Sequence, residues 1–328
     1  METVPSGWVE LYNAALRRAA RAGAKSSRSK LETAKRLEAS RVKAAADYVS
    51  LKLKRVALSM PFLDSLHPFH RELVNTMVEE DRYRLCLSRL YSVSKIVRRI
   101  ARESLSAIAR SGDAKSAAKA RRAFMGRLRS ILEELDDCLK SVKAWQAEIA
   151  KLPSIDPYTP SIVLAGAPNV GKSSLLRSIS RARPEVKPYP FTTTNVVVGH
   201  LELAGRVVQA IDTPGLLDRP LPEKGLVERR AIAALRHLKG VTVFIFDPTS
   251  TSGFPLDYQL AVYKGVKELL GEAPLVVAAN KVDITRPEQA SELVKILREE
   301  SRNIVFISAL HNVNIDYLLK QIEELLFP

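Results

Sequence analysis

The chain has 328 residues, more than one domain usually contains, so we expect two domains. Hydrophobic residues make up 46% and charged residues 27%, an ordinary globular composition that excludes wholesale disorder. No apolar run reaches the roughly 18 to 20 residues that a membrane-spanning helix needs. The N-terminus also lacks the apolar core of a signal peptide.

The net charge of +15 is concentrated in the first half of the chain. Residues 1–155 hold 31 Lys and Arg against 17 Asp and Glu, whereas residues 156–328 hold 20 against 19. A one-sided excess suits a polyanion, and nucleic acid is the favoured partner. A membrane surface is the weaker option because the basic stretch 11–58 offers few aromatic anchors. Candidate phosphate contacts are the pairs Arg17-Arg18, Arg98-Arg99 and Arg121-Arg122.

Two cysteines, Cys86 and Cys138, are too few for a disulfide framework. Both lie in apolar periodic sequence, so we expect each of them to be a buried free thiol. Thiols that stay reduced indicate a reducing compartment, and the expected location is therefore cytoplasmic.

The first half is predicted to be an all-α helical bundle. Basic, alanine-rich sequence over residues 11–58 indicates one or two helices with a break near residues 22–29. The stretches 85–100 and 128–149 carry apolar residues in steps of three and four, so each forms a single stripe on one helix face. Asp113 is a predicted N-cap of the helix that follows it. Long helices with short connections favour antiparallel packing.

A proline-rich linker precedes the second half. Three prolines fall within residues 152–160, where they stop the preceding helix. Beyond it, short β-branched runs alternate with helical patterns at residues 162–165, 196–203, 207–211, 241–246, 275–279 and 304–307. This alternation predicts an α/β domain with a mostly parallel six-stranded sheet and helices on both faces. We therefore predict a helical domain over residues 1–155 and an α/β domain over residues 156–328.

A candidate phosphate-binding loop follows the first predicted strand. Its residues are Gly166, Ala167, Pro168, Asn169, Val170, Gly171, Lys172, Ser173 and Ser174. They match the pattern GxxxxGK(S/T) between a strand and a helix start, where backbone N–H groups and the helix N-terminus surround phosphates. Lys172 is the expected contact of the β- and γ-phosphates, and Ser173 is an expected Mg²⁺ ligand.

Three further motifs follow at the ends of successive predicted strands. Asp212 begins Asp-Thr-Pro-Gly, which places a carboxylate near Mg²⁺ and the Gly215 N–H near the γ-phosphate. The motif Asn280-Lys281-Val282-Asp283 places a carboxylate where it can accept from N1–H and the amino group of guanine, a pattern that adenine lacks. A backbone N–H of Ser308-Ala309-Leu310 can meet the guanine O6. Together the motifs predict a domain that binds GTP or GDP with Mg²⁺.

This set of motifs resembles the translation-factor class of GTPases. The segment Tyr-Pro-Phe-Thr-Thr, within residues 188–195, is a candidate first switch and resembles the Obg-related branch. Upstream, residues 69–90 and 121–153 resemble the helical domain of Nog-type nucleolar GTP-binding proteins. The resemblance implies a GTPase that assembles the large ribosomal subunit by binding its rRNA. Because the chain stops directly after the α/β domain, it looks like a short archaeal relative without the C-terminal extension.

The resemblance also implies roles for single residues. Thr193 matches the switch threonine that contacts Mg²⁺ and the γ-phosphate, with Thr192 and Thr194 as alternative registers. Leu216 stands where Ras-like proteins have a water-orienting glutamine, so unassisted hydrolysis should be slow. Asn169 matches an asparagine that helps to hold K⁺ in some relatives. The alternative is that Asn169 only shapes the loop by bonding its own backbone.

We therefore predict a monomeric GTPase that hydrolyses GTP to GDP and phosphate while its basic bundle binds rRNA. Lys172, Thr193 and Gly215 are the residues expected to act at the γ-phosphate. The alternative is an RNA-binding structural placeholder in which GTP mainly supplies stability and hydrolysis is negligible. Leu216 keeps this alternative open, because none of the motifs supplies an obvious group to activate water.

Overall fold

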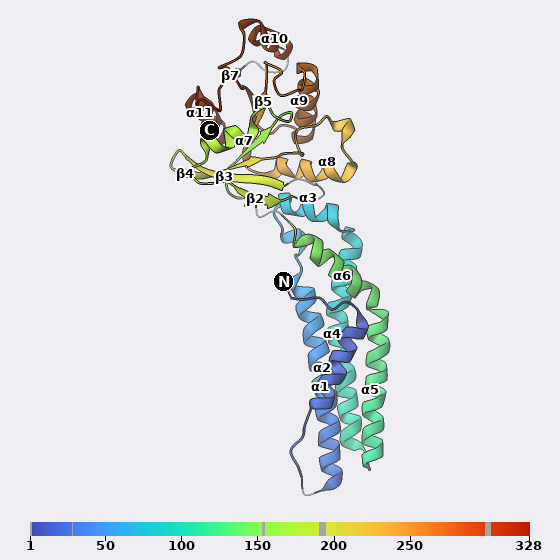
Figure 1. Cartoon of the computed structure of the whole chain (residues 1–328). Coiled ribbons are helices and arrows are strands. Elements are labelled where there is room, and N and C mark those ends of the chain that lie inside the picture. Colours follow the sequence, from blue (N-terminus) through green and yellow to red (C-terminus); the bar gives the residue numbers. More distant parts are fainter. Residues whose placement is uncertain (1, 28, 153–154, 190–194, 299–302) are drawn as a thin grey trace. The chain divides into compact units, whose positions relative to one another are not determined.

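The computed structural model describes residues 2–27, 29–152, 155–189, 195–298 and 303–328 (Figure 1). They form two compact units. The first unit comprises Met1–Ser65 and Met77–Ala150, and the second comprises Leu66–Thr76 and Lys151–Pro328. The short segment Leu66–Thr76, which lies within the helical half of the sequence, is therefore part of the second unit.

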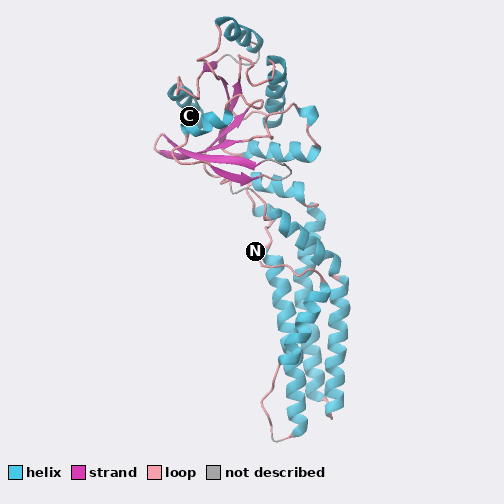
Figure 2. Cartoon of the chain, in the orientation of Figure 1, coloured by secondary structure: helices cyan, strands magenta, loops and turns pink. Residues whose placement is uncertain are grey.

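The first unit is an all-helical bundle, as predicted (Figure 2). Its main elements are α1 (Trp8–Arg21), α2 (Lys30–Ser59), α4 (Glu80–Arg110), α5 (Ala114–Glu134) and α6 (Asp136–Ile149), with a 3-10 turn η1 (Leu63–Ser65). Helix α2 packs against α1, α4 and α5, and α4 packs against α5 and α6. The core consists of apolar side chains at helical spacing, among them Val49, Leu53, Leu90, Val97, Leu128 and Leu132.

Side-chain caps and loops set the helix boundaries. Asp113 Oδ1 accepts a hydrogen bond from the Ser116 N–H at 2.7 Å, so the predicted N-cap is confirmed. The predicted break near residues 22–29 is the connection between α1 and α2. The single helix predicted over residues 128–149 is wrong, because the chain turns at Leu135 between α5 and α6. Leu135 is buried like its neighbours in the stripe, so the apolar pattern runs on through the turn.

Cys86 on α4 and Cys138 on α6 form a disulfide, with their Cα atoms 5.1 Å apart. The prediction of two free thiols is therefore wrong, and the inference of a reducing compartment loses its basis. Helical periodicity correctly places each thiol on a buried face. It does not show that the two buried faces belong to helices that pack together, 52 residues apart in the sequence.

The second unit is an α/β fold around one sheet. Its strands are β1 (Ser161–Ala165), β2 (Glu185–Pro188), β3 (Asn195–Leu203), β4 (Arg206–Asp212), β5 (Gly240–Phe246), β6 (Leu275–Ala279) and β7 (Ile304–Phe306). They lie in the order β2-β3-β4-β1-β5-β6-β7. The pairs β2–β3 and β3–β4 are antiparallel, and the four other pairs are parallel. The sheet is mostly parallel, as predicted.

Within the described ranges the sheet has seven strands, whereas six were predicted. The additional strand is β2, whose Val186 lies opposite Val197 of β3. Two prolines, Pro184 and Pro188, and two charged residues give this segment no strand pattern of its own. An edge strand tolerates proline because one side of its backbone makes no ladder hydrogen bonds. The strand therefore forms because it pairs with β3, and the periodicity of its own sequence does not reveal that pairing.

Helices cover both faces of the sheet, as predicted. One apolar layer involves α3 (Pro68–Met77), α8 (Leu226–Ala233), α9 (Leu256–Leu270) and α10 (Pro287–Leu297), and the other involves α7 (Lys172–Ile179) and α11 (Ile315–Leu326). Two 3-10 turns, η2 (Leu221–Glu223) and η3 (Ala234–His237), flank α8. Along β5, Phe244 and Phe246 enter the first layer while Val243 and Ile245 enter the second.

Helix α3 is part of the core of the second unit. Phe69 and Leu73 are fully buried and belong to the same apolar cluster as Leu216, which follows the Asp-Thr-Pro-Gly motif. At the surface of this contact, Glu72 forms an ion pair with Arg236 at 3.3 Å. Burial of two large apolar side chains of α3 stabilises the α/β fold.

Leu73→Ala is expected to lower the free energy of unfolding of the second unit by about 2–5 kcal/mol, because truncation leaves a cavity in a closed core. The matched control is Leu226→Ala, whose wild-type side chain is 77% exposed. It should stay within about 0.5 kcal/mol of wild type. Hydrogen exchange of peptides from β1 and β5 in a urea series measures the unfolding of this unit. Equal effects of the two substitutions would contradict the role given to α3.

Candidate nucleotide-binding site

The predicted phosphate loop opens on a hollow of about 380 Å³ beside the carboxyl ends of β1 and β4. The hollow is lined by Pro168, Asn169, Gly171, Lys172, Ser173, Ser174, Pro214 and Asp218. Ala167 and Val170 are fully buried and anchor the loop in the apolar layer below α7 and α11. Open parallel sheets bind ligands at this edge, where the strands end and helices begin.

Two glycines give the loop its course. Gly166 has φ +139° and Gly171 has φ +104°, both in the region that favours glycine. A Cβ at Gly166 would lie 2.4 Å from the carbonyl oxygen of Ile245, and one at Gly171 would lie 2.1 Å from Asn280 Nδ2. Any side chain at either position would therefore displace the strand end or the asparagine on which the loop rests.

Lys172 is almost completely buried at the start of α7. Its Nζ donates hydrogen bonds to the carbonyl oxygens of Gly166 and Ala167, at 2.8 Å each. Burial lowers the pKa of this ammonium group, and the charges of Asp212 and Asp218 oppose that shift. A buried ammonium group that lines an open hollow is well placed to meet the oxygens of a phosphate.

Asp212 and Ser173 form the predicted metal pair. Asp212 is fully buried at the end of β4, and its Oδ2 accepts a hydrogen bond from Ser173 Oγ at 2.5 Å. Its Oδ1 is buried and has no hydrogen-bond partner among the described residues. Burial raises the pKa of this carboxyl group, while the bond from Ser173 and the charge of Lys172 lower it. The unsatisfied carboxylate oxygen beside a hydroxyl group fits a hydrated Mg²⁺ ion, which takes oxygen ligands and keeps several waters.

The third predicted metal ligand, Thr193, lies outside the described residues, as do Thr192 and Thr194. Their roles stay predictions.

The turn after β4 holds the predicted γ-phosphate contact. The Gly215 N–H donates a hydrogen bond to Asp218 Oδ2 at 2.7 Å. The preceding Thr213 donates from Oγ1 to the carbonyl oxygen of Leu164 at 2.8 Å, which ties the turn to β1. Leu216 is fully buried in the apolar layer that contains α3. The side chain at the position of the Ras-like glutamine therefore packs in the core.

Asn280 connects the phosphate loop with residues 308–310, which are predicted to contact guanine O6 and are called the guanine loop below. Its Nδ2 donates to the carbonyl oxygen of Val170 at 2.8 Å, and its Oδ1 accepts from the Ala309 N–H at 2.9 Å. One of the three backbone N–H groups predicted to meet guanine O6, that of Ala309, is thus bonded to Asn280 in this structure. The neighbouring Ser308 is buried, whereas the Leu310 side chain is exposed.

Asp283 lies on the connection after β6 and is held by the neighbouring guanine loop. A hydrogen bond from the Ser308 side chain lowers the pKa of its carboxyl group. His311 Nε2 lies 3.7 Å from Asp283 Oδ2. Asp283 is therefore kept as an ionised acceptor, the state that recognition of the guanine N1–H and amino group requires.

Asn169 reaches from the phosphate loop to the loop after β5. Its backbone is left-handed, with φ +60°, and its Nδ2 lies 3.5 Å from the carbonyl oxygen of Ser252, at the outer limit of a hydrogen bond. The side chain thus contacts a different loop in this structure. Binding of K⁺ at this residue stays a prediction.

Asp247, which follows β5 and is fully buried, is not among the predicted site residues. Its Oδ2 accepts from Lys281 Nζ and from the Ser252 N–H, each at 2.7 Å, and its Oδ1 accepts from the Thr249 N–H at 2.9 Å. Burial raises the pKa of the carboxyl group, but the bonds from Lys281 and Thr249 outweigh burial and lower it. Asp247 ends a buried strand as Asp212 does, and that position was the signal available in the sequence.

The fold, the glycine loop and the Asp283 loop define a P-loop protein of the GTP-binding class. Two protein-family profiles match: "NOG1 N-terminal helical domain" over residues 1–156 and "50S ribosome-binding GTPase" over residues 161–281. The chain belongs to the NOG1 family of nucleolar GTP-binding proteins.

Two curated relatives agree with this assignment. The chain is 32% identical over 269 residues to nucleolar GTP-binding protein 1 of Drosophila melanogaster. The matched region covers 80% of this chain and 41% of the Drosophila protein. The chain is 34% identical over 241 residues to the Saccharomyces cerevisiae protein of that name, covering 74% and 37%. A crystal structure from Plasmodium falciparum under that name shares 34% identity, covers 53% of this chain and 90% of its own, and has a TM-score of 0.46. The chain spans about two fifths of the length of the curated relatives it matches.

The expectation of a cytoplasmic location is contradicted by these relatives, whose names place them in the nucleolus. The expectation depended on free thiols, and the structure pairs the two cysteines. None of the helices in the described ranges is long and apolar enough to cross a membrane.

Asp247→Asn is expected to lower the affinity for GDP about tenfold or more, because Lys281 and the loop at Ser252 lose a charged acceptor. It should also lower the free energy of unfolding by about 1–3 kcal/mol at neutral pH. Since the folded-state pKa of Asp247 is lowered, its stabilisation is present at neutral pH and is lost as the pH falls through that pKa. The wild type and the variant should therefore converge in acid.

Fluorescent-GDP titration and urea unfolding at neutral and acidic pH measure these effects. The matched control is Asp257→Asn, which removes the same charge from an exposed residue on α9. If both variants bind GDP alike, Asp247 does not position Lys281.

Proposed function

We propose that this chain binds GTP with Mg²⁺, hydrolyses it to GDP and phosphate, and acts in the assembly of the large ribosomal subunit by binding rRNA. The observation that carries the nucleotide part is the unsatisfied, buried Asp212 carboxylate beside Ser173 and the buried Lys172. The ribosomal part is supported by the match to the 50S ribosome-binding GTPase profile and by relatives named as nucleolar.

In the proposed complex, each half of the site has a defined role. Lys172 exchanges its loop carbonyl partners for β- and γ-phosphate oxygens, and Ser173 with Asp212 holds Mg²⁺, together with Thr193 of the first switch. Bound Mg²⁺ neutralises charge on the phosphates. On the other side, Asp283 accepts from the guanine N1–H and amino group. Asn280 fixes the spacing between the two halves through its bonds to Val170 and Ala309.

We expect hydrolysis by the isolated chain to be slow, because the buried Leu216 side chain cannot orient a water molecule. Asn169 on the rim of the hollow is the proposed contact for K⁺, which would add positive charge where charge develops during phosphoryl transfer. Lys172, Thr193 and Gly215 are the proposed groups at the γ-phosphate.

Single-turnover hydrolysis in KCl should be about tenfold or more faster than in NaCl at equal ionic strength, because a held cation stabilises the developing charge. Asn169→Ala should remove the difference while it leaves binding of GDP with Mg²⁺ within about twofold. Equal rates of the wild type in the two salts would remove K⁺ from the proposal. Absence of hydrolysis with and without ribosomal subunits would favour the placeholder function instead.

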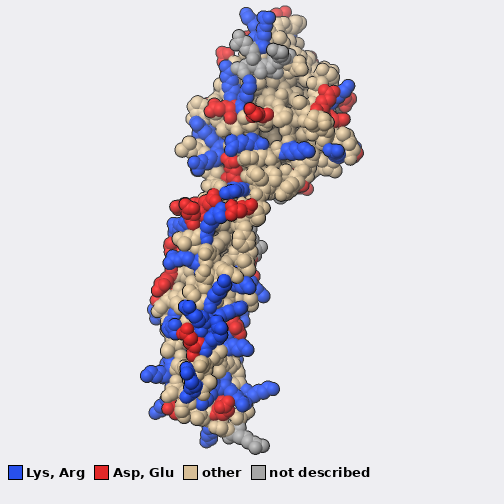
Figure 3. Space-filling view, turned by 180° about the vertical axis from the view of Figure 1, so that it is seen from behind, with Lys and Arg blue, Asp and Glu red and all other residues tan. Residues whose placement is uncertain are grey.

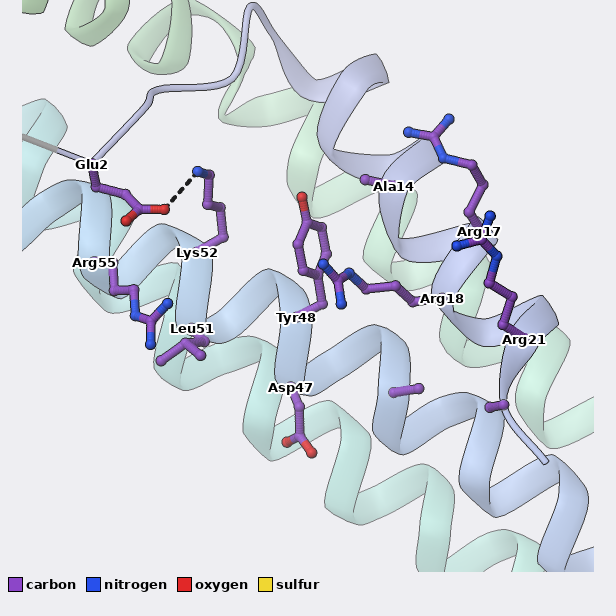
Figure 4. Close-up of a pocket in the computed structure, with 12 residues that line it drawn as sticks. Glu2, Ala14, Arg17, Arg18, Arg21, Asp47, Tyr48, Leu51, Lys52 and Arg55 are labelled. Carbon is purple, nitrogen blue, oxygen red and sulfur yellow. Dashed lines mark hydrogen bonds and ion pairs between the residues drawn. The ribbon is translucent and has the colours of Figure 1, made fainter. Parts of the chain in front are cut away.

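The proposed RNA contact is a basic groove between α1 and α2 in the helical unit (Figure 4). The groove has a volume of about 950 Å³. Its charged lining consists of five basic and two acidic side chains: Arg17, Arg18, Arg21, Lys52, Arg55, Glu2 and Asp47. Lys and Arg also outnumber acidic side chains over the face of this unit seen in Figure 3.

Some basic side chains of the groove contact other residues of the chain, and others are exposed to solvent. Lys52 forms an ion pair with Glu2 at 2.7 Å, and the Arg18 guanidinium lies 4.2 Å from the centre of the Tyr48 ring (Figure 4). Arg17, Arg21 and Arg55 are exposed. Exposed arginines along a groove suit the phosphate backbone of RNA, and contacts of this type weaken as salt rises.

The triple variant Arg17→Ala, Arg21→Ala and Arg55→Ala should weaken binding to large-subunit rRNA. It should also reduce the slope of log affinity against log salt by about two to three units. The matched control replaces Arg102, Arg110 and Lys119, which are exposed on α4 and α5, with alanine. Filter binding over a salt series measures the slopes. Equal losses in the two triple variants would show that the charge acts diffusely and that the groove is not the contact.

Sedimentation with large ribosomal subunits tests the proposal as a whole. Co-migration that is stronger with a non-hydrolysable GTP analogue than with GDP, at matched salt, supports an assembly switch. Equal co-migration in the two states supports the placeholder function. No co-migration in either state would contradict the ribosomal part.

A further inference from the structure

We propose that Asp218 determines the preference of this site between GDP and GTP. Its carboxylate accepts a hydrogen bond from the Gly215 backbone N–H, the donor that a γ-phosphate would need. The inference rests on the proposed function and assigns a specificity-determining role to a residue that is not among the predicted site residues. It follows from one hydrogen bond, the position of the side chain in the hollow and the charges that surround it.

The hydrogen bond places an anion at the γ-phosphate end of the site. Asp218 Oδ2 accepts from the Gly215 N–H at 2.7 Å, and the side chain lines the hollow together with Lys172 and Ser173. Asp218 is 8% exposed, and its Oδ1 is buried without a hydrogen-bond partner among the described residues. The Arg219 Nε lies 4.0 Å from that oxygen, an ion pair beyond hydrogen-bonding distance. One oxygen of this carboxylate therefore makes no hydrogen bond within the described part of the chain.

The buried cations near Asp218 have other partners. Lys172, which lines the same hollow, donates hydrogen bonds to the carbonyl oxygens of Gly166 and Ala167. The other buried cation nearby is Lys224, whose Nζ lies 3.4 Å from a Glu228 carboxylate oxygen. Asp218 thus acts as a negative charge within the hollow.

GDP and GTP differ in whether they compete with Asp218 for the Gly215 N–H. GDP ends at the β-phosphate, so the bond between Gly215 and Asp218 is compatible with GDP. GTP brings a γ-phosphate to the same N–H, and two anions cannot share one donor at hydrogen-bonding distance. GTP binding must therefore move the Asp218 carboxylate away, and the loss of a charge-assisted hydrogen bond weakens GTP binding relative to GDP binding.

Displacement of Asp218 also disturbs a packed segment. The two residues between Gly215 and Asp218 are Leu216 and Leu217, and both are fully buried in the apolar layer that contains α3. Closely packed cores resist small continuous shifts. A change of partner at Gly215 is therefore coupled to the packing of this turn.

The test compares the dissociation constants of GDP and of the non-hydrolysable analogue GMPPNP, with Mg²⁺, for the full chain. In Asp218→Ala, affinity for GMPPNP should rise about tenfold while affinity for GDP stays within about twofold. Asp218→Asn keeps the shape and removes the charge, so it should shift the ratio in the same direction by a smaller factor. Glu223→Gln is the matched control, because Glu223 is an exposed carboxylate five residues further along the chain.

Unchanged GDP affinity shows that each variant is folded at the site, and Asp218→Asn decides the test if Asp218→Ala does not fold. Equal shifts for both nucleotides, or weaker binding of GMPPNP alone, would overturn the inference and leave Asp218 as a turn-stabilising residue. Failure of the wild type to bind either nucleotide would instead overturn the proposed function, so the two failures are distinguishable.

Discussion

The side chain of Asn280 holds the nucleotide site together. Its amide joins the carbonyl oxygen of Val170 in the phosphate loop to the Ala309 N–H in the guanine loop, so it sets the distance between the two halves of a nucleotide pocket. Gly171 passes so close to this amide that no side chain fits there. The left-handed turn at Gly171, the start of α7 and the position of Lys172 therefore all depend on one buried asparagine.

The end of the site that is predicted to hold the phosphates contains buried charged side chains, and some of their polar atoms lack hydrogen-bond partners among the described residues. Lys172 bonds loop carbonyl groups, while Asp212 and Asp218 each keep one buried oxygen without a hydrogen-bond partner among the described residues. Such groups cost stability in the free protein and would gain partners in the proposed complex with a nucleotide and Mg²⁺. The guanine end differs, since Asp247 is satisfied by Lys281 and by its own loop.

The core of the α/β unit extends beyond the chain segment that carries the motifs. The chain leaves the helical unit after residue 65, forms most of α3 and returns to the helical unit at residue 77, so the backbone passes between the units three times. Phe69 and Leu73 of this helix share one apolar layer with Leu216. The packing of α3 and the packing of the turn that carries Gly215 are consequently not independent. Residues 66–76 therefore contribute to the core of the α/β unit.

The sequence by itself determined the helical and α/β halves, six of the strands and the motifs predicted to bind phosphate, metal and guanine. Each of these is a local pattern of spacing within one strand, loop or helix. Tertiary structure alone decided the edge strand β2, the pairing of Cys86 with Cys138, and the place of α3. It also decided the partners of Asp247 and Gly215. Most of these depend on which distant segment a residue meets, and the bond between Gly215 and Asp218 depends on how a buried turn closes. Periodicity records only that a residue is buried, and not what it is buried against.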